Sequence, residues 1–168
     1  MKKKVLPVIV AILLILVIGG CALGKVLLDK YSYSKEEADW NEFYQVSESD
    51  RSAIILQDVM VEEQALIRDD VCYFDLATVH KYMNEVFYAD MTENLLLYAN
   101  PTEVIRTTFG ETSYTTTEGT QDAGYVISFV EGDTVYVAAD YVKLFTNYSY
   151  DCYDRHVQVY TEWGTRPA

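Results

Sequence analysis

Residues 69–83, DDVCYFDLATVHKYM, contain the pattern that decides the fold. The pair Asp69-Asp70 is typical of a turn, and Val71–Phe74 is a short run of strand-forming residues. Asp75 is well placed to cap a helix in which one face is shared by Leu76, Val79, Tyr82 and Met83. This stretch therefore predicts a turn, a strand and a short helix in immediate succession.

A second stretch, residues 132–146, repeats this order at an offset of 63. The overlay aligns Asp70 with Asp133, Tyr73 with Tyr136, Val79 with Val142, Tyr82 with Phe145, Asn84 with Asn147 and Phe87 with Tyr150. A hairpin is predicted after each helix, around residues 90–94 and 151–155. Because the matches fall on turn and buried positions alike, we expect an internal repeat, about 65–99 and about 126–161.

The flanking sequence continues the β texture. Residues 53–56 and 59–61 read as strands before the first repeat, and Thr-rich residues 103–106 and 113–117 read as connecting strands. The predicted fold class is α+β: a mainly antiparallel β module over residues 53–163, with short helices and two related strand-helix-hairpin halves. Residues 164–168 form a short tail.

Residues 29–52 are interpreted as a helix and linker that precede this module. Ser34 and Glu37 have the spacing of a capping box. Trp40, Phe43 and Tyr44 then fall on one helix face, which we interpret as a surface that docks on the module.

The N-terminal residues predict a membrane anchor. Residues 1–4 contain three lysines, and residues 5–28 are apolar apart from Lys25. This apolar run is long enough to cross a bilayer once. Up to residue 28 there are four basic and no acidic residues, whereas beyond it nine basic face 26 acidic residues, a net charge of −17. This asymmetry predicts a single-pass signal anchor in a bacterial cell membrane, with a cytoplasmic N-terminus and an extracellular domain.

Two other readings of the same segment stay open. A signal peptide would be cleaved and the domain secreted, although the apolar run is long for that. Ile18-Gly19-Gly20-Cys21 is similar to a bacterial lipobox, in which Cys21 would be lipidated. Cys72 and Cys152 remain beyond the anchor, and they form either a disulfide or two thiols.

No constellation of residues predicts catalysis, a metal site or a cofactor. His80 and His156 are the only histidines, and we interpret both as solvent-facing rather than as catalytic bases. Adjacent acid pairs diverge, which does not suit a glycosidase. The acidic turns at 90–94 and 151–154 lack the spacing of a calcium loop. The acidic charge also argues against nucleic acid as a partner.

The order of these segments resembles the copper amine oxidase N-terminal-like domain. The runs KYSYSKEEADWNEFY (30–44), AIILQD (53–58), LLLYANPTEVIR (95–106) and VYTEWG (159–164) are similar to the N-terminal stalk of clostridial glycoside hydrolase family 18 proteins. The resemblance implies a surface module without the catalytic barrel, because the hydrolase motif D-x-x-D-x-D-x-E is absent. It implies no copper chemistry, since that site takes three histidines, and Tyr148 is interpreted as a strand residue rather than a cofactor precursor.

The resulting function hypothesis is a non-catalytic, membrane-anchored stalk or assembly module of the cell envelope. An alternative is a module that binds an envelope glycan such as peptidoglycan or chitin, because fifteen tyrosines offer rings on which sugars stack. The sequence does not identify which aromatic residues would do so. A second alternative is the N-terminal part of a family 18 hydrolase. The partners expected are the lipid bilayer through residues 5–28 and either a cell-wall glycan or another envelope protein.

Overall fold

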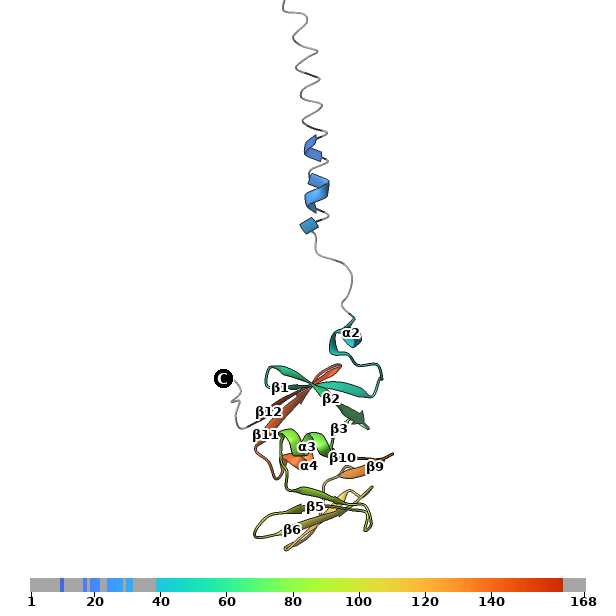
Figure 1. Cartoon of the computed structure of the whole chain (residues 1–168), viewed down its shortest axis with the longest axis vertical. Coiled ribbons are helices and arrows are strands. Elements are labelled where there is room, and N and C mark those ends of the chain that lie inside the picture. Colours follow the sequence, from blue (N-terminus) through green and yellow to red (C-terminus); the bar gives the residue numbers. More distant parts are fainter. Residues whose placement is uncertain are drawn as a thin grey trace, which may run out of the picture. The chain divides into compact units, whose positions relative to one another are not determined.

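The computed structural model describes residues 39–161 throughout and, before them, residues 10, 17, 19–21, 24–28 and 30–31. Contacts within the chain divide it into two units, Met1–Ala38 and Asp39–Ala168. All the described strands lie in the second unit, which we call the folded domain (Figure 1). The capping box at residues 34–37 and the tail at 164–168 lie outside the described residues.

Seven strands form the larger sheet, in the order β11-β12-β1-β2-β3-β10-β9. Their bounds are Arg51–Leu56 (β1), Val59–Arg68 (β2), Val71–Asp75 (β3), Ser128–Glu131 (β9), Thr134–Ala138 (β10), Tyr148–Cys152 (β11) and His156–Thr161 (β12). Neighbouring strands are antiparallel except β1 and β12, which run parallel with Ile54 opposite Val157. The sheet therefore joins the first strand of the domain to the last.

Five strands form a second, antiparallel sheet in sequence order. They are Phe87–Asp90 (β4), Leu95–Ala99 (β5), Val104–Thr108 (β6), Ser113–Thr116 (β7) and Gly119–Asp122 (β8). The last strand was not predicted, because its sequence, GTQD, contains no apolar residues that could alternate; all four residues are exposed.

The predicted α+β fold class is wrong, since the described domain is mostly β and is divided between two sheets. The predicted symmetry of two strand-helix-hairpin halves also breaks after the helices. The hairpin β4–β5 belongs to the smaller sheet, whereas β11–β12 belongs to the larger one. The physical reason is the Thr-rich segment after β5. It supplies β6, which pairs with β5, and β7, which pairs with β6, so the β4–β5 hairpin becomes part of a separate sheet.

The correspondence at offset 63 holds for the paired strands before the helices. Arg68 pairs with Val71 across the β2–β3 turn, and Glu131 pairs with Thr134 across the β9–β10 turn, which is the same register. Strands β3 and β10 then pair with each other, with Phe74 opposite Val137. Because these two residues are themselves 63 positions apart, the hairpins meet about a local pseudo-two-fold axis.

Short helices follow β3 and β10 and pack on those strands: Leu76–Tyr82 (α3) and Ala139–Lys143 (α4). Asp75 caps α3 as predicted, because its carboxylate accepts a hydrogen bond from the Thr78 amide. No side chain caps α4, which begins after Ala138; its Tyr141 and Val142 are buried instead. Burial thus replaces capping in the second helix.

An aromatic layer joins the smaller sheet to α4. Phe87 of β4 lies with its ring centroid 6.1 Å from those of Tyr141 and Phe145, and Tyr98 of β5 stacks on Phe145 at 4.4 Å. Tyr114 of β7 meets Tyr141 edge-on at 5.4 Å. The helices α3 and α4 thus lie between the two sheets, as Figure 1 shows.

The predicted membrane anchor is contradicted. Among the described residues, no helix is both long and apolar enough to cross a bilayer. A crossing needs about 20 consecutive apolar residues, and the longest described helical run before residue 39, residues 24–28, includes Lys25. This finding overturns the predicted signal anchor over residues 5–28 and the single-pass membrane location inferred from it. Much of residues 5–28 lies outside the described residues.

Candidate functional site

The folded domain begins with a one-turn helix, Trp40–Tyr44 (α2), whose apolar side chains lie on the surface. Asp39 caps it by accepting hydrogen bonds from the amides of Asn41 (2.9 Å) and Glu42 (3.4 Å). The helix ends at Gln45, whose φ of 56° turns the chain and whose carbonyl accepts a hydrogen bond from the Gln64 side chain of β2. The next residue, Val46, is buried. These contacts fix α2 against the larger sheet.

Four aromatic rings continue from α2 to the β11–β12 turn. Trp40 stacks on Tyr44 with centroids 6.1 Å apart, and Tyr44 stacks on His156 at 4.7 Å. Tyr153 also stacks on His156 at 4.7 Å with an interplanar angle of 14°. The imidazole therefore lies between two tyrosine rings. We call these residues, together with Asp154, the aromatic cleft.

The aromatic cleft has a volume of about 230 Å³ and an exposed aromatic rim. Trp40 and Tyr153 each expose 54% of their surface. The Asp154 carboxylate lies beside the rings and is almost fully exposed, although it forms a long ion pair of 3.8 Å with Arg155. Nδ1 of His156 is buried and has no hydrogen-bond partner among the described residues. The cleft thus combines flat apolar surfaces with a few polar groups, as small-ligand sites commonly do.

The β11–β12 turn that holds Tyr153 is itself anchored. Its residue Arg155 has a φ of 69°, and the Tyr153 amide donates to the His156 carbonyl at 2.9 Å. The Arg155 carbonyl accepts from the Ala53 amide of β1, and its guanidinium donates to the Ser49 carbonyl. The turn is therefore held by the strand and linker that follow α2.

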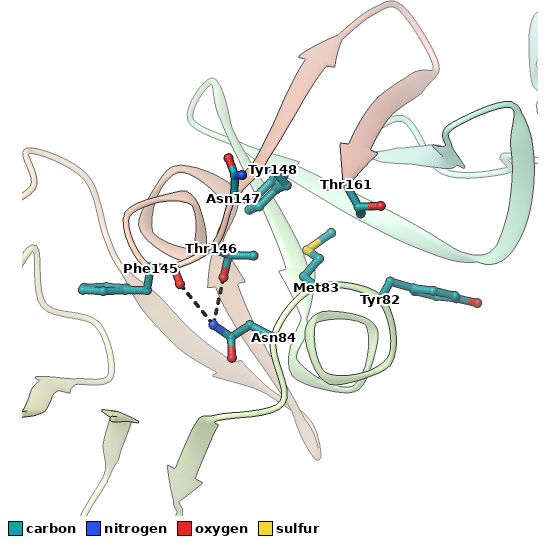
Figure 2. A pocket seen from close by; sticks show the side chains of 8 residues that line it. All are labelled: Tyr82, Met83, Asn84, Phe145, Thr146, Asn147, Tyr148 and Thr161. Atoms are coloured by element: carbon teal, nitrogen blue, oxygen red, sulfur yellow. Dashed lines mark hydrogen bonds between the residues drawn. The ribbon is translucent and has the colours of Figure 1, made fainter. Parts of the chain in front are cut away.

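A second cavity, of about 270 Å³, lies where the segments after α3 and α4 meet (Figure 2). The Asn84 amide donates to the Phe145 carbonyl at 3.2 Å and to the Thr146 hydroxyl at 2.9 Å. The lining of the cavity includes residues 82–84 and 145–147, which are equivalent at the offset of 63. Figure 2 shows Tyr82 and Phe145 pointing away from each other. Because the Asn84 donor is engaged within the protein, we interpret this cavity as a structural joint.

The other residues considered in the sequence have structural contacts. Nε2 of His80 is hydrogen-bonded to the Phe87 carbonyl at 2.5 Å, far from the aromatic cleft in the chain. Asp90 accepts hydrogen bonds from the amides of Thr92 and Glu93, which closes the β4–β5 turn. Tyr148 is a buried residue of β11, and its hydroxyl donates to the Ala139 carbonyl; burial raises its pKa. No group of three or more His, Cys, Asp or Glu suited to a metal occurs within the described residues.

The cysteines separate into two groups. Cys21 is exposed in the first unit, and nothing in its described surroundings tests the predicted lipidation. Cys72 is buried in β3 and Cys152 is exposed at the end of β11, and the two thiols are close enough that each shifts the pKa of the other. The structure therefore brings together the two residues between which the sequence left a disulfide open.

Comparison of the chain with protein-family models, with curated proteins and with solved structures gave no match. The resemblance to the copper amine oxidase N-terminal-like domain therefore stays a prediction. The aromatic cleft is the feature on which a function can be argued.

Proposed function

We propose that the folded domain is a non-catalytic binding module that holds saccharide rings in the aromatic cleft. The observation that carries this proposal is the nearly parallel arrangement of Trp40, Tyr44 and Tyr153 around one cleft, with Trp40 and Tyr153 exposed. The C–H faces of pyranose rings are apolar and stack on such flat aromatic surfaces. A one-turn helix and a hairpin turn supply the rings, and both are held by backbone contacts, so little ordering is needed on binding.

The polar groups of the cleft narrow the ligand class. The exposed Asp154 carboxylate accepts hydrogen bonds, which suits sugar hydroxyl and amide N–H groups. Beyond residue 28 the chain carries a net charge of −17, which repels polyanions. We therefore propose neutral saccharides, of which β-linked oligomers of glucose and N-acetylglucosamine are the first probes.

The test is titration calorimetry of the chain with cellotetraose and chitotetraose. Replacing Trp40 with alanine removes the exposed indole of the cleft and is expected to lower the affinity by about tenfold or more. The matched control is Tyr88→Ala, because Tyr88 is 60% exposed on β4 and lies outside the cleft. This control is expected to bind like the unaltered chain.

Two outcomes would contradict the saccharide proposal. The first is no heat of binding at millimolar concentration of either probe. The second is an equal loss of affinity in Trp40→Ala and Tyr88→Ala, which would show that the binding does not involve the cleft.

A second candidate is a passive stalk or assembly role. The stacking of Tyr44 on His156 and the hydrogen bond from Gln64 to Gln45 favour it, because both attach the α2 segment to the larger sheet. In this case the aromatic rings serve as a joint. Trp40→Ala would then change the unfolding midpoint of the chain and leave no saccharide affinity to measure.

A further inference from the structure

Strands β3 and β11 meet although they are not neighbours in the sheet. Three strands, β12, β1 and β2, lie between them in the hydrogen-bonded order. Nevertheless the ring of Phe74 on β3 contacts the ring of Tyr150 on β11, with centroids 6.4 Å apart. The larger sheet therefore coils until its edge strand faces its interior strand.

The two cysteines lie beside this contact. Cys72 is two residues before Phe74, and Cys152 is two residues after Tyr150, so each shares a strand face with its aromatic neighbour. One cysteine precedes its aromatic neighbour along the chain and the other follows it, and β3 and β11 run in opposite directions. The two cysteines therefore lie across from each other. Each thiol influences the pKa of the other, and Cys72 is 3% exposed whereas Cys152 lies on the surface.

The contact gives the two thiols different reactivity. The interaction with Cys72 lowers the pKa of Cys152, and the same interaction together with burial raises the pKa of Cys72. A thiol that is exposed and readily ionised is the one that attacks a disulfide. Its buried partner is positioned to resolve the product.

We propose that Cys72 and Cys152 form a disulfide bond by exchange with a low-molecular-weight disulfide such as oxidised glutathione. The Cys152 thiolate attacks one glutathione sulfur, which breaks the glutathione S–S bond and releases one glutathione thiolate. The Cys72 thiol then loses its proton to solvent and attacks the Cys152 sulfur, which releases the second glutathione thiolate. The cysteine pair loses two electrons and two protons, and the glutathione disulfide gains both.

The bond would tie the edge strand to β3 without any rearrangement of the sheet order. It links covalently the two end strands of the hydrogen-bonded series β11-β12-β1-β2-β3. The inference is independent of saccharide binding, because neither cysteine belongs to the aromatic cleft.

The test uses the full chain with Cys21→Ser, so that only this pair supplies thiols. The protein is equilibrated in glutathione buffers of increasing oxidised fraction, acid-quenched, alkylated and analysed by mass spectrometry. The expected product is two hydrogens lighter, accepts no alkylating agent, and yields a proteolytic peptide that links residues 72 and 152.

Single variants in the same background assign the roles. With Cys72→Ser, Cys152 is expected to keep one glutathione adduct, because no resolving thiol remains. With Cys152→Ser, Cys72 is expected to react with glutathione disulfide at least about tenfold more slowly than Cys152 does, because Cys72 is buried. Circular dichroism confirms that each variant is folded.

Either of two results would overturn the proposal. One is two alkylatable thiols in fully oxidised glutathione while the protein is folded. The other is an adduct on Cys152 of the C21S chain that never converts to the linked peptide.

Discussion

Glu63 connects β2 to α3 through two hydrogen bonds on the surface of the domain. Its carboxylate accepts from Nζ of Lys81 at 2.7 Å and from the Tyr82 hydroxyl at 3.0 Å. The bond from Lys81 is the main reason that the pKa of Glu63 lies below its ordinary value of 4.5. A lowered pKa means that folding favours the ionised carboxylate.

This residue makes stability depend on acidity. The contribution of Glu63 is fully present above its unfolded pKa and is lost as pH falls from there through the lower folded pKa. Glu63→Gln is therefore expected to reduce the loss of unfolding free energy between pH 6 and pH 3, measured by urea denaturation at each pH. The matched control is Glu62→Gln, because Glu62 is exposed on the other face of β2. An identical pH dependence in E63Q and the unaltered chain would contradict the prediction.

At the scale of elements, the aromatic layer holds the smaller sheet against α4. Phe87 is 1% exposed and contacts Tyr98, Tyr141 and Phe145. Phe87→Ala is expected to lower the unfolding free energy by about 3–5 kcal/mol, because it removes buried contacts and leaves a cavity. The neighbouring Tyr88 points outward on the same strand.

Tyr88→Ala is the control for this layer, with an expected change of about 0.5 kcal/mol or less. Chemical denaturation followed by tryptophan fluorescence measures both. If Phe87→Ala and Tyr88→Ala cost the same, the smaller sheet is not held by the aromatic layer.

Single elements could be predicted from the sequence where the signal is local. The turn at Asp69-Asp70, the strand after it and the helix capped by Asp75 all lie where residues 69–83 predict them. The membership of each sheet could not be predicted. The pairing of β1 with β12 joins residues about a hundred positions apart, and both strands read equally well as partners of their sequence neighbours. Strand pairing of this kind is decided by packing across the whole domain.

The thiol pair belongs to the scale of the whole molecule, because its bond would enclose residues 72–152. By the chain-entropy estimate, closing a loop of this length stabilises the folded state by about 4 kcal/mol. We expect oxidised protein to unfold at higher urea concentration than protein kept in a reducing agent. In Cys152→Ser the midpoint is expected to be the same in both conditions. The prediction would be contradicted if the urea midpoint of the unaltered chain were the same with and without the reducing agent.

The aromatic cleft is also a property of the whole molecule, because its two parts come from opposite ends of the folded domain. The sequence therefore indicated only the part on α2. The spacing of Trp40, Phe43 and Tyr44 indicated an aromatic helix face. Nothing in residues 151–156 marked Tyr153 and His156 as its neighbours, since that turn reads as an ordinary polar hairpin. The two parts meet only because β12 pairs with β1, the strand that follows α2 and its linker.

The parallel pairing of β1 with β12 has a mechanical consequence. A force applied to the domain through residue 51 and residue 161 pulls β1 at its beginning and β12 at its end. Because the strands run in the same direction, this load acts along them as shear, and the hydrogen bonds between residues 53–56 and 156–159 must break together. Antiparallel strands pulled at one shared end would instead unzip bond by bond. Tension between residues 51 and 161 therefore loads all of these hydrogen bonds at once.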